Sequence, residues 1–527
     1  MSPVSIFLLA IATIFVVGIV GELVFARTGI PDVVWLITVG VILGPVTGFV
    51  TREGLMTIAP YFGALTLVIV LFDGGSELRI DELKQAAGRG TLLAVFGFIL
   101  AVLAVAVVAK AASWAGVLPE WTWMQAILLG TILGGSSSVV IMPALSKAGL
   151  SPKISNLVNL ESALTDVLSV VATGAVIQIL AASAVDGAQA AGAGGAAMTL
   201  GKSFGVGVGS GLIAGLLTIL VLSRLNRSEY AYPLLLGFFL VVYVFVDEMD
   251  GSAALAILVA AVMAGNAPSL SKKIGLAQVA FLGGNVKGVH GVITFFIKSF
   301  FFVFIGAMLG PPFGLLFFGV GIGIILLLAR LPNVVVATAR SGLSTPARSL
   351  IAVLLPRGMA AGVLAMMPFQ SGVTMIPVDL NGTPSDNLPV VVFAAVLTTI
   401  LLFAAGFPIF KKRLPASDLA GESGHHGTLA GSFVPHGPEP AKSVEATALK
   451  ASLGAESLGE AETVAGPRIP LGGNGAGASA AETVQAGPSP RAPADATRVD
   501  PGGPSARSAL PLTSPSDTPE TQSEDPQ

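Results

Sequence analysis

The stretch NLVNLESALTDVLSVVATG, residues 156–174, places Glu161 and Asp166 inside a long apolar run. A carboxylate at the centre of a membrane costs about 2.5–3.5 kcal/mol even on lenient scales, so such residues are usually functional. Ser162 lies four residues before Asp166 and shares its helical face, whereas Glu161 lies about 140° away around the helix. The stretch therefore predicts a membrane helix in which one acid faces an ion path and the other is held by a buried base.

The composition of the whole chain agrees with a membrane protein. Of its 527 residues, 53% are hydrophobic and 11% are charged, and the mean hydropathy is +0.83. A soluble protein carries roughly a quarter charged residues, so this chain falls outside that class. The absence of cysteine excludes thiolate metal sites and a catalytic cysteine.

Apolar runs of membrane-spanning length recur as far as Phe410. They predict an all-α integral membrane protein with about thirteen transmembrane helices, which excludes a soluble enzyme. The predicted ranges are 4–26, 32–50, 55–74, 90–112, 122–146, 153–182, 203–223, 230–247, 251–267, 288–310, 313–332, 346–370 and 388–410.

The distribution of Lys and Arg predicts the orientation of these helices. Sixteen of them fall in the odd-numbered connections and three in the even-numbered ones. Positive residues favour cytoplasmic loops, so we expect a multi-pass protein of the cell membrane with its N-terminus outside and its C-terminus inside.

The composition changes at about Leu414, where Pro, Gly, Ala and Ser become abundant and aromatic residues become rare. Such a segment buries too little apolar surface to offset its ordering entropy. We therefore expect a membrane domain over residues 1–413 and a disordered cytoplasmic tail over residues 414–527.

Two of the predicted spans contain residues that interrupt helices. LLGTILGGSSSVVIMPALSKAGL (128–150) has glycines, serines and a proline at mid-span, and LLPRGMAAGVLAMM (354–367) lies seven helices later. The two spans run in opposite directions, as inverted repeats require. Discontinuous helices at matching places in two halves are typical of a transporter binding site, so we expect two crossed discontinuous helices here.

Other ionisable residues also fall within predicted spans. Arg357 is permanently charged and suits bidentate contacts, so we expect it to pair with Glu161. Lys298 is expected to snorkel or to form a structural ion pair, although contact with the ion site stays open. His290 is interpreted as a loop residue.

Several motifs together resemble the NhaP-like monovalent cation–proton antiporters of the cation:proton antiporter superfamily. ESALTD (161–166) resembles their E-S-x-x-N-D motif, PRGMAAG (356–362) their Arg-Gly segment, and LFDGGSEL (71–78) their F-[DE]-x-G signature. GELVFARTGIPDVVWLITVGVILGP (21–45) is similar to the opening helix hairpin of the superfamily, and FFVFIGAML (301–309) to its tenth helix. The resemblance covers residues 4–410.

The resemblance implies roles for individual residues. Asp166 is implied to bind the ion and to exchange the proton, and Glu161 and Arg357 to form an ion pair in the moving core. The implied ion-binding set is Asp166, Ser162, Thr165, Asp73, Ser136 and Ser137, of which Asp166, Ser162 and Asp73 are the implied ligands of the metal ion. Lys298 occupies the helix in which some charge-moving relatives place a lysine beside the site.

The chain departs from the family pattern at two positions. Thr165 stands where the family has Asn, and Ser-Ser replaces the usual Thr-Asp at the first crossing. The second change removes an acid that would compensate a helix end, so the charge balance at the crossing is an open question for the structure.

The expected function is secondary exchange of Na⁺ or K⁺ for H⁺, electroneutral and with a bell-shaped dependence on pH, in the service of pH and cation homeostasis. A homodimer is implied, and neither a cofactor nor a nucleic-acid partner is expected. A gated cation channel and an ion-coupled symporter on the same inverted-repeat fold remain the alternatives.

Overall fold

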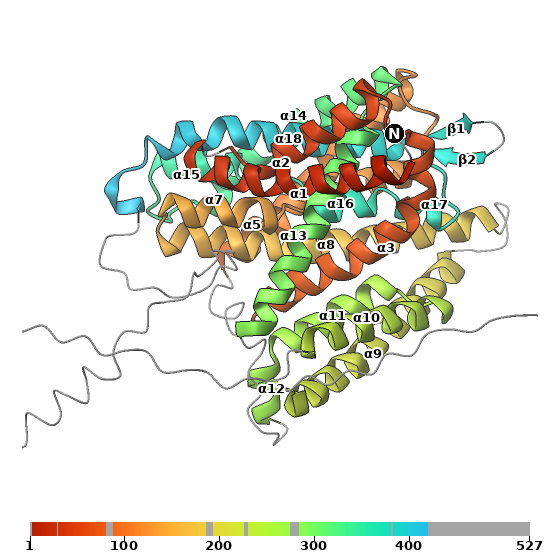
Figure 1. The fold of residues 1–527 in the computed structure, drawn as a ribbon, viewed down its shortest axis with the longest axis horizontal. Coiled ribbons are helices and arrows are strands. Elements are labelled where there is room, and N and C mark those ends of the chain that lie inside the picture. Colours follow the sequence, from red (N-terminus) through yellow and green to blue (C-terminus); the bar gives the residue numbers. More distant parts are fainter. Residues whose placement is uncertain are drawn as a thin grey trace, which may run out of the picture. The chain divides into compact units, whose positions relative to one another are not determined.

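The described part of the chain folds into helices joined by short connections, apart from one two-stranded hairpin (Figure 1). The computed structural model describes residues 3–28, 30–80, 88–185, 193–225, 230–273, 284–380 and 383–419. All of these residues lie within one unit, Met1–Gly437. The expectation of a helical membrane protein is confirmed for this part of the chain.

The elements carry the labels of Figure 1. In chain order they are α1 (Pro3–Thr28), α2 (Asp32–Val41), the π-helix η1 (Ile42–Val46), α3 (Arg52–Glu77), α5 (Arg89–Trp114), α6 (Trp123–Ile132), α7 (Ser138–Ala148), α8 (Pro152–Val185), α9 (Ala193–Leu225), α10 (Ala231–Glu248), α11 (Ala253–Gly265), α12 (Ala267–Lys273), α13 (Gly284–Met308), α14 (Phe313–Ala337), α15 (Thr345–Val353), α16 (Met359–Leu364), α17 (Met367–Gln370), β1 (Pro377–Leu380), β2 (Thr383–Asp386), α18 (Leu388–Lys411) and the 3-10 turn η2 (Ala416–Asp418).

Among the described residues, eight helices are long and apolar enough to cross a membrane, and the bent pair α11–α12 makes a ninth. Each of the thirteen predicted ranges overlaps a helix or an interrupted pair of helices. Four further apolar helical segments of the described residues are only 10–17 residues long. The number thirteen therefore stays a prediction.

The helices pack as two groups. In the core group, α5 packs against α6, α8 and α14, and α18 packs against α14, α15 and α16. In the frame group, α11 packs against α3, α9 and α10, and α13 packs against α1 and α2. The helix with the two acids, α8, belongs to the core group and meets the frame group at α3, α9 and α11.

Glycines permit a close helix crossing in the frame group, between α2 and α13. A Cβ atom on Gly40 would overlap the carbonyl oxygen of Val303, and one on Gly306 would overlap that of Ile37. Small residues allow two membrane helices to bring their backbones together in this way. The crossing therefore depends on the absence of side chains at both glycines.

Connections that the charge distribution assigns to one side of the membrane do meet in space. At one end of the bundle, Arg52 Nη1 donates to Pro311 O at 3.0 Å and Arg52 Nη2 to Asn387 Oδ1 at 2.5 Å. At the other end, Lys153 Nζ donates to Ser341 O at 2.6 Å. The helices therefore alternate in direction as expected, while the assignment of either end to the cytoplasm stays a prediction.

The structure departs from the expected architecture in three places. First, β1 and β2 form a short antiparallel hairpin in the connection between α17 and α18, with Pro377 opposite Asp386; the sequence analysis did not predict this hairpin, which leaves the all-α class unchanged. Second, α11 and α12 meet at a bend of 74°. The sequence analysis did not predict this break.

The third departure concerns the beginning of the expected tail, residues 414–419. Ser151 N donates to Asp418 O at 3.0 Å, Ser344 Oγ contacts Asp418 Oδ2 at 2.5 Å, and Leu419 pairs with Leu150. Residues 414–419 therefore pack against the helical part of the chain. Residues 420–527 lie outside the described part of the chain, so their expected disorder stays a prediction.

We predict that Gly306→Ala destabilises the protein by about 1–3 kcal/mol, the usual cost of overpacking, because its methyl group would overlap the α2 backbone. Gly321→Ala is the matched control: Gly321 lies on the apolar helix α14 and has nothing within 4 Å of its Cβ position. Apparent unfolding free energies in detergent measure both changes. Equal stability of the two variants would show that the α2–α13 crossing is not tight.

Candidate functional site

The site is built around two interrupted helices that cross in the core group. One extended segment joins α6 to α7 over residues 133–137, and the other joins α15 to α16 over residues 354–358. Ser137 N donates to Pro356 O at 2.9 Å, which joins the two segments backbone to backbone. A Cβ atom on Gly358 would overlap the Ser137 side chain, so this approach requires glycine. The expected crossing of two discontinuous helices is confirmed.

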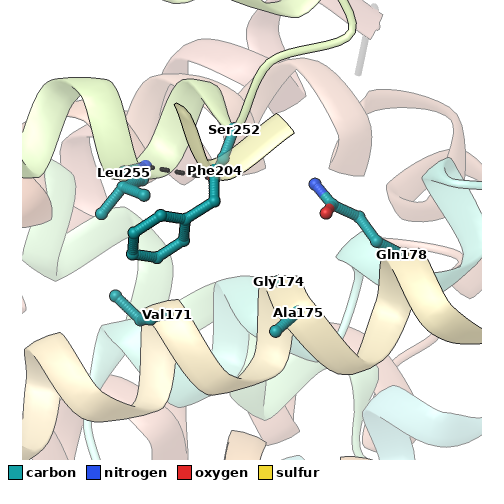
Figure 2. A pocket seen from close by; sticks show the side chains of 7 residues that line it. All are labelled: Val171, Gly174, Ala175, Gln178, Phe204, Ser252 and Leu255. Carbon is teal, nitrogen blue, oxygen red and sulfur yellow. Dashed lines mark hydrogen bonds between the residues drawn. The ribbon is translucent and has the colours of Figure 1, made fainter. Parts of the chain in front are cut away.

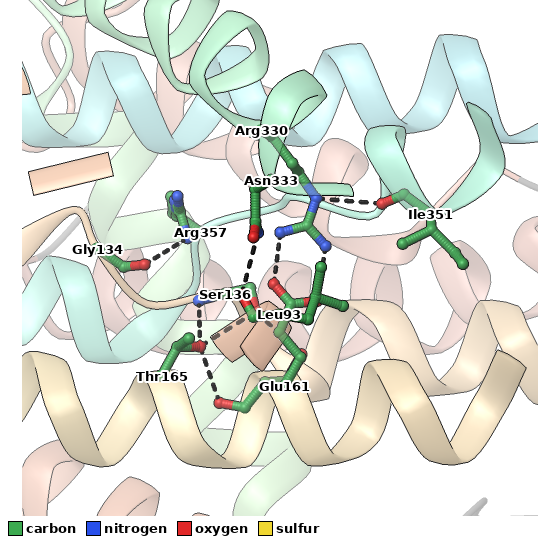
Figure 3. A network of polar contacts seen from close by, with 10 residues as sticks. Leu93, Gly134, Ser136, Glu161, Thr165, Arg330, Asn333, Ile351 and Arg357 are labelled. Carbon is green, nitrogen blue, oxygen red and sulfur yellow. Dashed lines mark hydrogen bonds and ion pairs between the residues drawn. The ribbon is translucent and has the colours of Figure 1, made fainter. Parts of the chain in front are cut away.

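Arg357 lies at the crossing and compensates one of its helix ends. Its Nη1 donates to Gly134 O at 3.0 Å, just beyond the C-terminus of α6 (Figure 3). A cation at the C-terminal end of a helix interacts favourably with the helix dipole. Arg357 N donates in turn to Thr399 Oγ1 of α18 at 3.1 Å. A buried guanidinium thus neutralises partial negative charge at the crossing from which the usual acid is missing.

Hydroxyl groups from α8 close the first interruption. Ser136 Oγ lies 3.1 Å from Ser162 Oγ and 3.3 Å from Thr165 Oγ1, and Ser136 N donates to Thr165 Oγ1 at 3.1 Å (Figure 3). All three side chains are buried. The broken backbone at Ser136 therefore finds its hydrogen-bond partner within the protein, which membrane depth demands.

Asp166 lies next to this cluster, on the same helix as Ser162 and Thr165. The Cβ position of Gly135 is 3.2 Å from Asp166 Oδ1. In the described part of the chain, no hydrogen bond or ion pair of Asp166 is found, although it interacts electrostatically with Arg357, Glu77 and Asp73. The structure thus places a carboxylate beside a cluster of neutral hydroxyl groups.

The sequence predicted an ion pair between Glu161 and Arg357. Glu161 does form an ion pair, but its partner is Arg330. Arg330 on α14 binds Glu161 in a bidentate manner, with Nη1–Oε1 at 2.5 Å and Nη2–Oε2 at 2.7 Å, and its Nε donates to Ile351 O at 3.1 Å (Figure 3). Arg330 and Glu161 are both buried. This pair links α8, α14 and the end of α15, whereas Arg357 lies one segment further on and is engaged by Gly134.

Asp73 is held by partners that the sequence did not predict. Its Oδ1 lies 2.7 Å from His290 Nε2, and His290 Nδ1 lies 2.9 Å from the Tyr232 hydroxyl. His290 belongs to α13, so its interpretation as a loop residue is wrong. The three residues come from α3, α13 and α10 of the frame group. Asp73 therefore belongs to the frame group, whereas Asp166 belongs to the core group.

Lys298 forms a structural ion pair away from the crossing. Its Nζ lies 2.6 Å from Asp32 Oδ2, and both side chains are about nine-tenths buried. Asp32 stands at the beginning of α2, which packs against α13. The ammonium group is thus neutralised inside the frame group, in agreement with the expectation of a structural pair.

Of the predicted site residues, the structure brings Ser136, Ser162, Thr165 and Asp166 together, and it places Ser137 at the backbone crossing. Sequence reasoning missed Arg330, which lies near a predicted helix end, and Glu77, which lies one turn after Asp73. In the described ranges, no group of three or more His, Cys, Asp or Glu residues is arranged to hold a resident metal ion.

A separate hollow lies along α8, between the core group and the frame group. It is lined by residues of α8, α9 and the start of α11, and its empty volume, open solvent included, is about 230 Å³ (Figure 2). Gln178 Nε2 donates across it to Ser203 Oγ. The hollow contains none of the predicted site residues.

The chain matches known proteins over its helical part. The family model described as the transmembrane sodium/hydrogen exchanger matches residues 11–412. The solved structure of the sodium proton antiporter MjNhaP1 from Methanocaldococcus jannaschii aligns with 78% of this chain and 99% of its own, with a TM-score of 0.60 and 19% sequence identity. At that identity the structural likeness establishes the fold alone.

Curated relatives are named as antiporters. The K(+)/H(+) antiporter NhaP of Alkalimonas amylolytica is 25% identical over 59% of this chain and 51% of its own length. NhaP2 of Shewanella sp. strain MR-4, also named a K(+)/H(+) antiporter, is 28% identical over 50% of this chain and 45% of its own. The chain thus spans about half the length of these two relatives. A probable Na(+)/H(+) antiporter of M. jannaschii is 23% identical over 76% of this chain and 96% of its own.

We predict that Arg330→Gln destabilises the protein by about 3–5 kcal/mol, because it leaves the buried Glu161 carboxylate without its partner. Adding Glu161→Gln to that variant recovers much of the loss. Unfolding in detergent measures the coupling energy of each double-mutant cycle. We expect the Glu161–Arg330 cycle to give a larger coupling energy than the Glu161–Arg357 cycle. A larger coupling of Glu161 to Arg357 would restore the pairing that the sequence predicted.

Proposed function

Because the chain belongs to the sodium/hydrogen exchanger family, we propose that it is a secondary active antiporter that exchanges Na⁺ or K⁺ for H⁺. The names of its relatives, which include K(+)/H(+) and Na(+)/H(+) antiporters, support this assignment. The arrangement of Asp166 beside the crossing of two interrupted helices carries the proposal.

The chemistry of the exchange follows from one carboxylate among neutral oxygens. Hard cations take oxygen ligands, and the Asp166 carboxylate supplies the negative charge that holds a monovalent cation. Protonation removes that charge, so the site holds a cation or a proton but not both. Each species then drives the release of the other, which couples the two gradients.

Alternating access requires that Asp166 reaches each side of the membrane in turn. The core group contains both interrupted helices and α8, and the Glu161–Arg330 pair fastens α8 to α14 inside that group. The frame group has its own ties, the Asp32–Lys298 and Asp73–His290 contacts. We propose that the core group moves as a body against the frame group and carries Asp166 with it.

The exchange is proposed to be electroneutral, with one cation for one proton. Lys298, the base that would add a charge to the cycle, is neutralised by Asp32. Asp73 is engaged by His290, which leaves Asp166 as the carboxylate beside the hydroxyl cluster.

The cellular setting follows from the family resemblance and from the charge distribution. We propose a homodimer in the cell membrane, with the N-terminus outside and the tail in the cytoplasm, that serves pH and cation homeostasis. The ordered segment 414–419 at the start of the tail would then contact the cytoplasmic ends of α8 and α15.

We predict that Asp166→Asn abolishes cation-dependent dissipation of a proton gradient in reconstituted vesicles, because an amide neither ionises nor accepts a proton in this range. Na⁺, K⁺ and Li⁺ are added in turn. Asp250→Asn is the matched control, since the Asp250 side chain is 88% exposed, and it keeps exchange at the wild-type rate. Exchange by the Asp166→Asn variant would refute the proposed site.

The pH dependence of exchange follows from the competition at Asp166. Because protons occupy the carboxylate that the cation needs, a fall of one pH unit in the acidic range raises the apparent KM for the cation by up to about tenfold. At high pH the rate falls again, because the return step needs a proton. Initial exchange rates over a series of pH values measure this bell shape, and a KM that is constant across the acidic range would contradict it.

A further inference from the structure

Ser169 has a buried hydroxyl group that the protein does not use. Its side chain is 1% exposed, and its Oγ has no hydrogen-bond partner in the described part of the chain. A buried polar group without a partner costs free energy, so it usually has a partner outside the protein chain or a functional reason to lack one. Ser169 lies three residues after Asp166, on the same side of α8.

Three oxygen atoms converge in front of Gly135. The position that a Cβ atom would take there is 2.8 Å from Ser169 Oγ, 3.1 Å from Thr165 O and 3.2 Å from Asp166 Oδ1. These distances place Ser169 Oγ at most 6.0 Å from Asp166 Oδ1, the sum of 2.8 and 3.2 Å. A hydroxyl, a carbonyl and a carboxylate oxygen thus lie close together around Gly135, where a side chain would clash with them.

We propose that Ser169 is a ligand of the transported cation, and that Ser169, the Thr165 carbonyl and Asp166 form one wall of its binding site in front of Gly135. The inference rests on the proposed function and extends it to a residue outside the predicted ion-binding set. The ion does not occupy the Cβ position itself, which is one bond length from Gly135. It lies farther out, where the oxygens of α8 still reach it.

The chemistry of these groups suits a monovalent cation. A hydroxyl oxygen has lone pairs free for a cation while its proton points away, and a carbonyl that already accepts a helical hydrogen bond keeps a second lone pair. The Ser169 hydroxyl would gain its missing partner on cation binding and lose it when Asp166 takes a proton. Ser169 therefore strengthens cation binding without adding a charge.

A comparison with Thr173 separates a ligand from a structural hydroxyl. Thr173 is one turn further along α8, is fully buried, and donates to Thr131 Oγ1 at 3.0 Å. We expect Ser169→Ala not to lower the melting temperature of the cation-free protein, because it removes a buried hydroxyl that has no partner, and to raise the KM for the cation roughly tenfold, with little change in kcat. We expect Thr173→Val to lower that melting temperature and to leave the KM unchanged.

Two further variants test the geometry. Ser169→Thr retains the hydroxyl and is expected to restore most of the cation affinity that Ser169→Ala loses. Gly135→Ala puts a methyl group among the three oxygens and is expected to abolish the rise in melting temperature that Na⁺ or K⁺ produces in detergent. That thermal shift reports cation binding without any exchange.

The outcomes distinguish this inference from the proposed function. If the wild type exchanges cations for protons while Ser169→Ala keeps the wild-type KM and thermal shift, the inference is overturned and the function stands. If Ser169→Ala and Thr173→Val change the KM equally, the effect of Ser169 is structural and the inference also fails. If the wild type shows neither exchange nor a cation-dependent thermal shift, both fail.

Discussion

The architecture depends on one constraint: backbone groups at membrane depth must find hydrogen-bond partners within the protein. Two helices of the core group stop at mid-span, and each interruption exposes amides and carbonyls that lipid cannot satisfy. The structure meets this demand with the Ser137–Pro356 backbone contact, the Ser136–Thr165 contact and the Arg357 guanidinium on Gly134. The polar surroundings of Asp166 are a consequence of this solution.

A second constraint is that charged side chains inside the helical bundle are paired, and Asp166 differs from the others in this respect. Glu161 pairs with Arg330, Asp32 with Lys298, and Asp73 with His290. A buried charge that lacks a partner is costly, and in the described residues Asp166 has no such partner. In the proposed cycle, a bound cation or a proton takes the place of the missing partner of Asp166. The same reasoning applies to the hydroxyl of Ser169, which is buried without a hydrogen bond.

The helical class and the two interruptions could be predicted from the sequence, because each leaves a local signature: apolar runs, and glycine and serine at mid-span. The carboxylate of Asp166 among hydrophobic residues marks a candidate site in the same way, and its role stays a proposal. The sequence could not predict which helices face one another. Arg357 suits a bidentate contact with Glu161 on its residue type alone, and Arg330, close to a predicted helix end, suits it equally, so only the packing of α14 against α8 identifies the partner. His290 was misplaced because it stands near the predicted start of its helix, whereas α13 already begins at Gly284, and nothing in the local sequence around Ser169 indicates a role for its hydroxyl group.

The central claim is that one carboxylate holds either a cation or a proton. Calorimetric titration of the detergent-solubilised protein with Na⁺ or K⁺, in buffers of different ionisation enthalpy, measures how many protons leave per cation bound. The account predicts about one proton released per cation at pH values where Asp166 is protonated in the absence of the cation, a release that declines towards zero as the pH rises, and none in Asp166→Asn. Cation binding without proton release at any pH, or the same release in the Asp166→Asn variant, would contradict it.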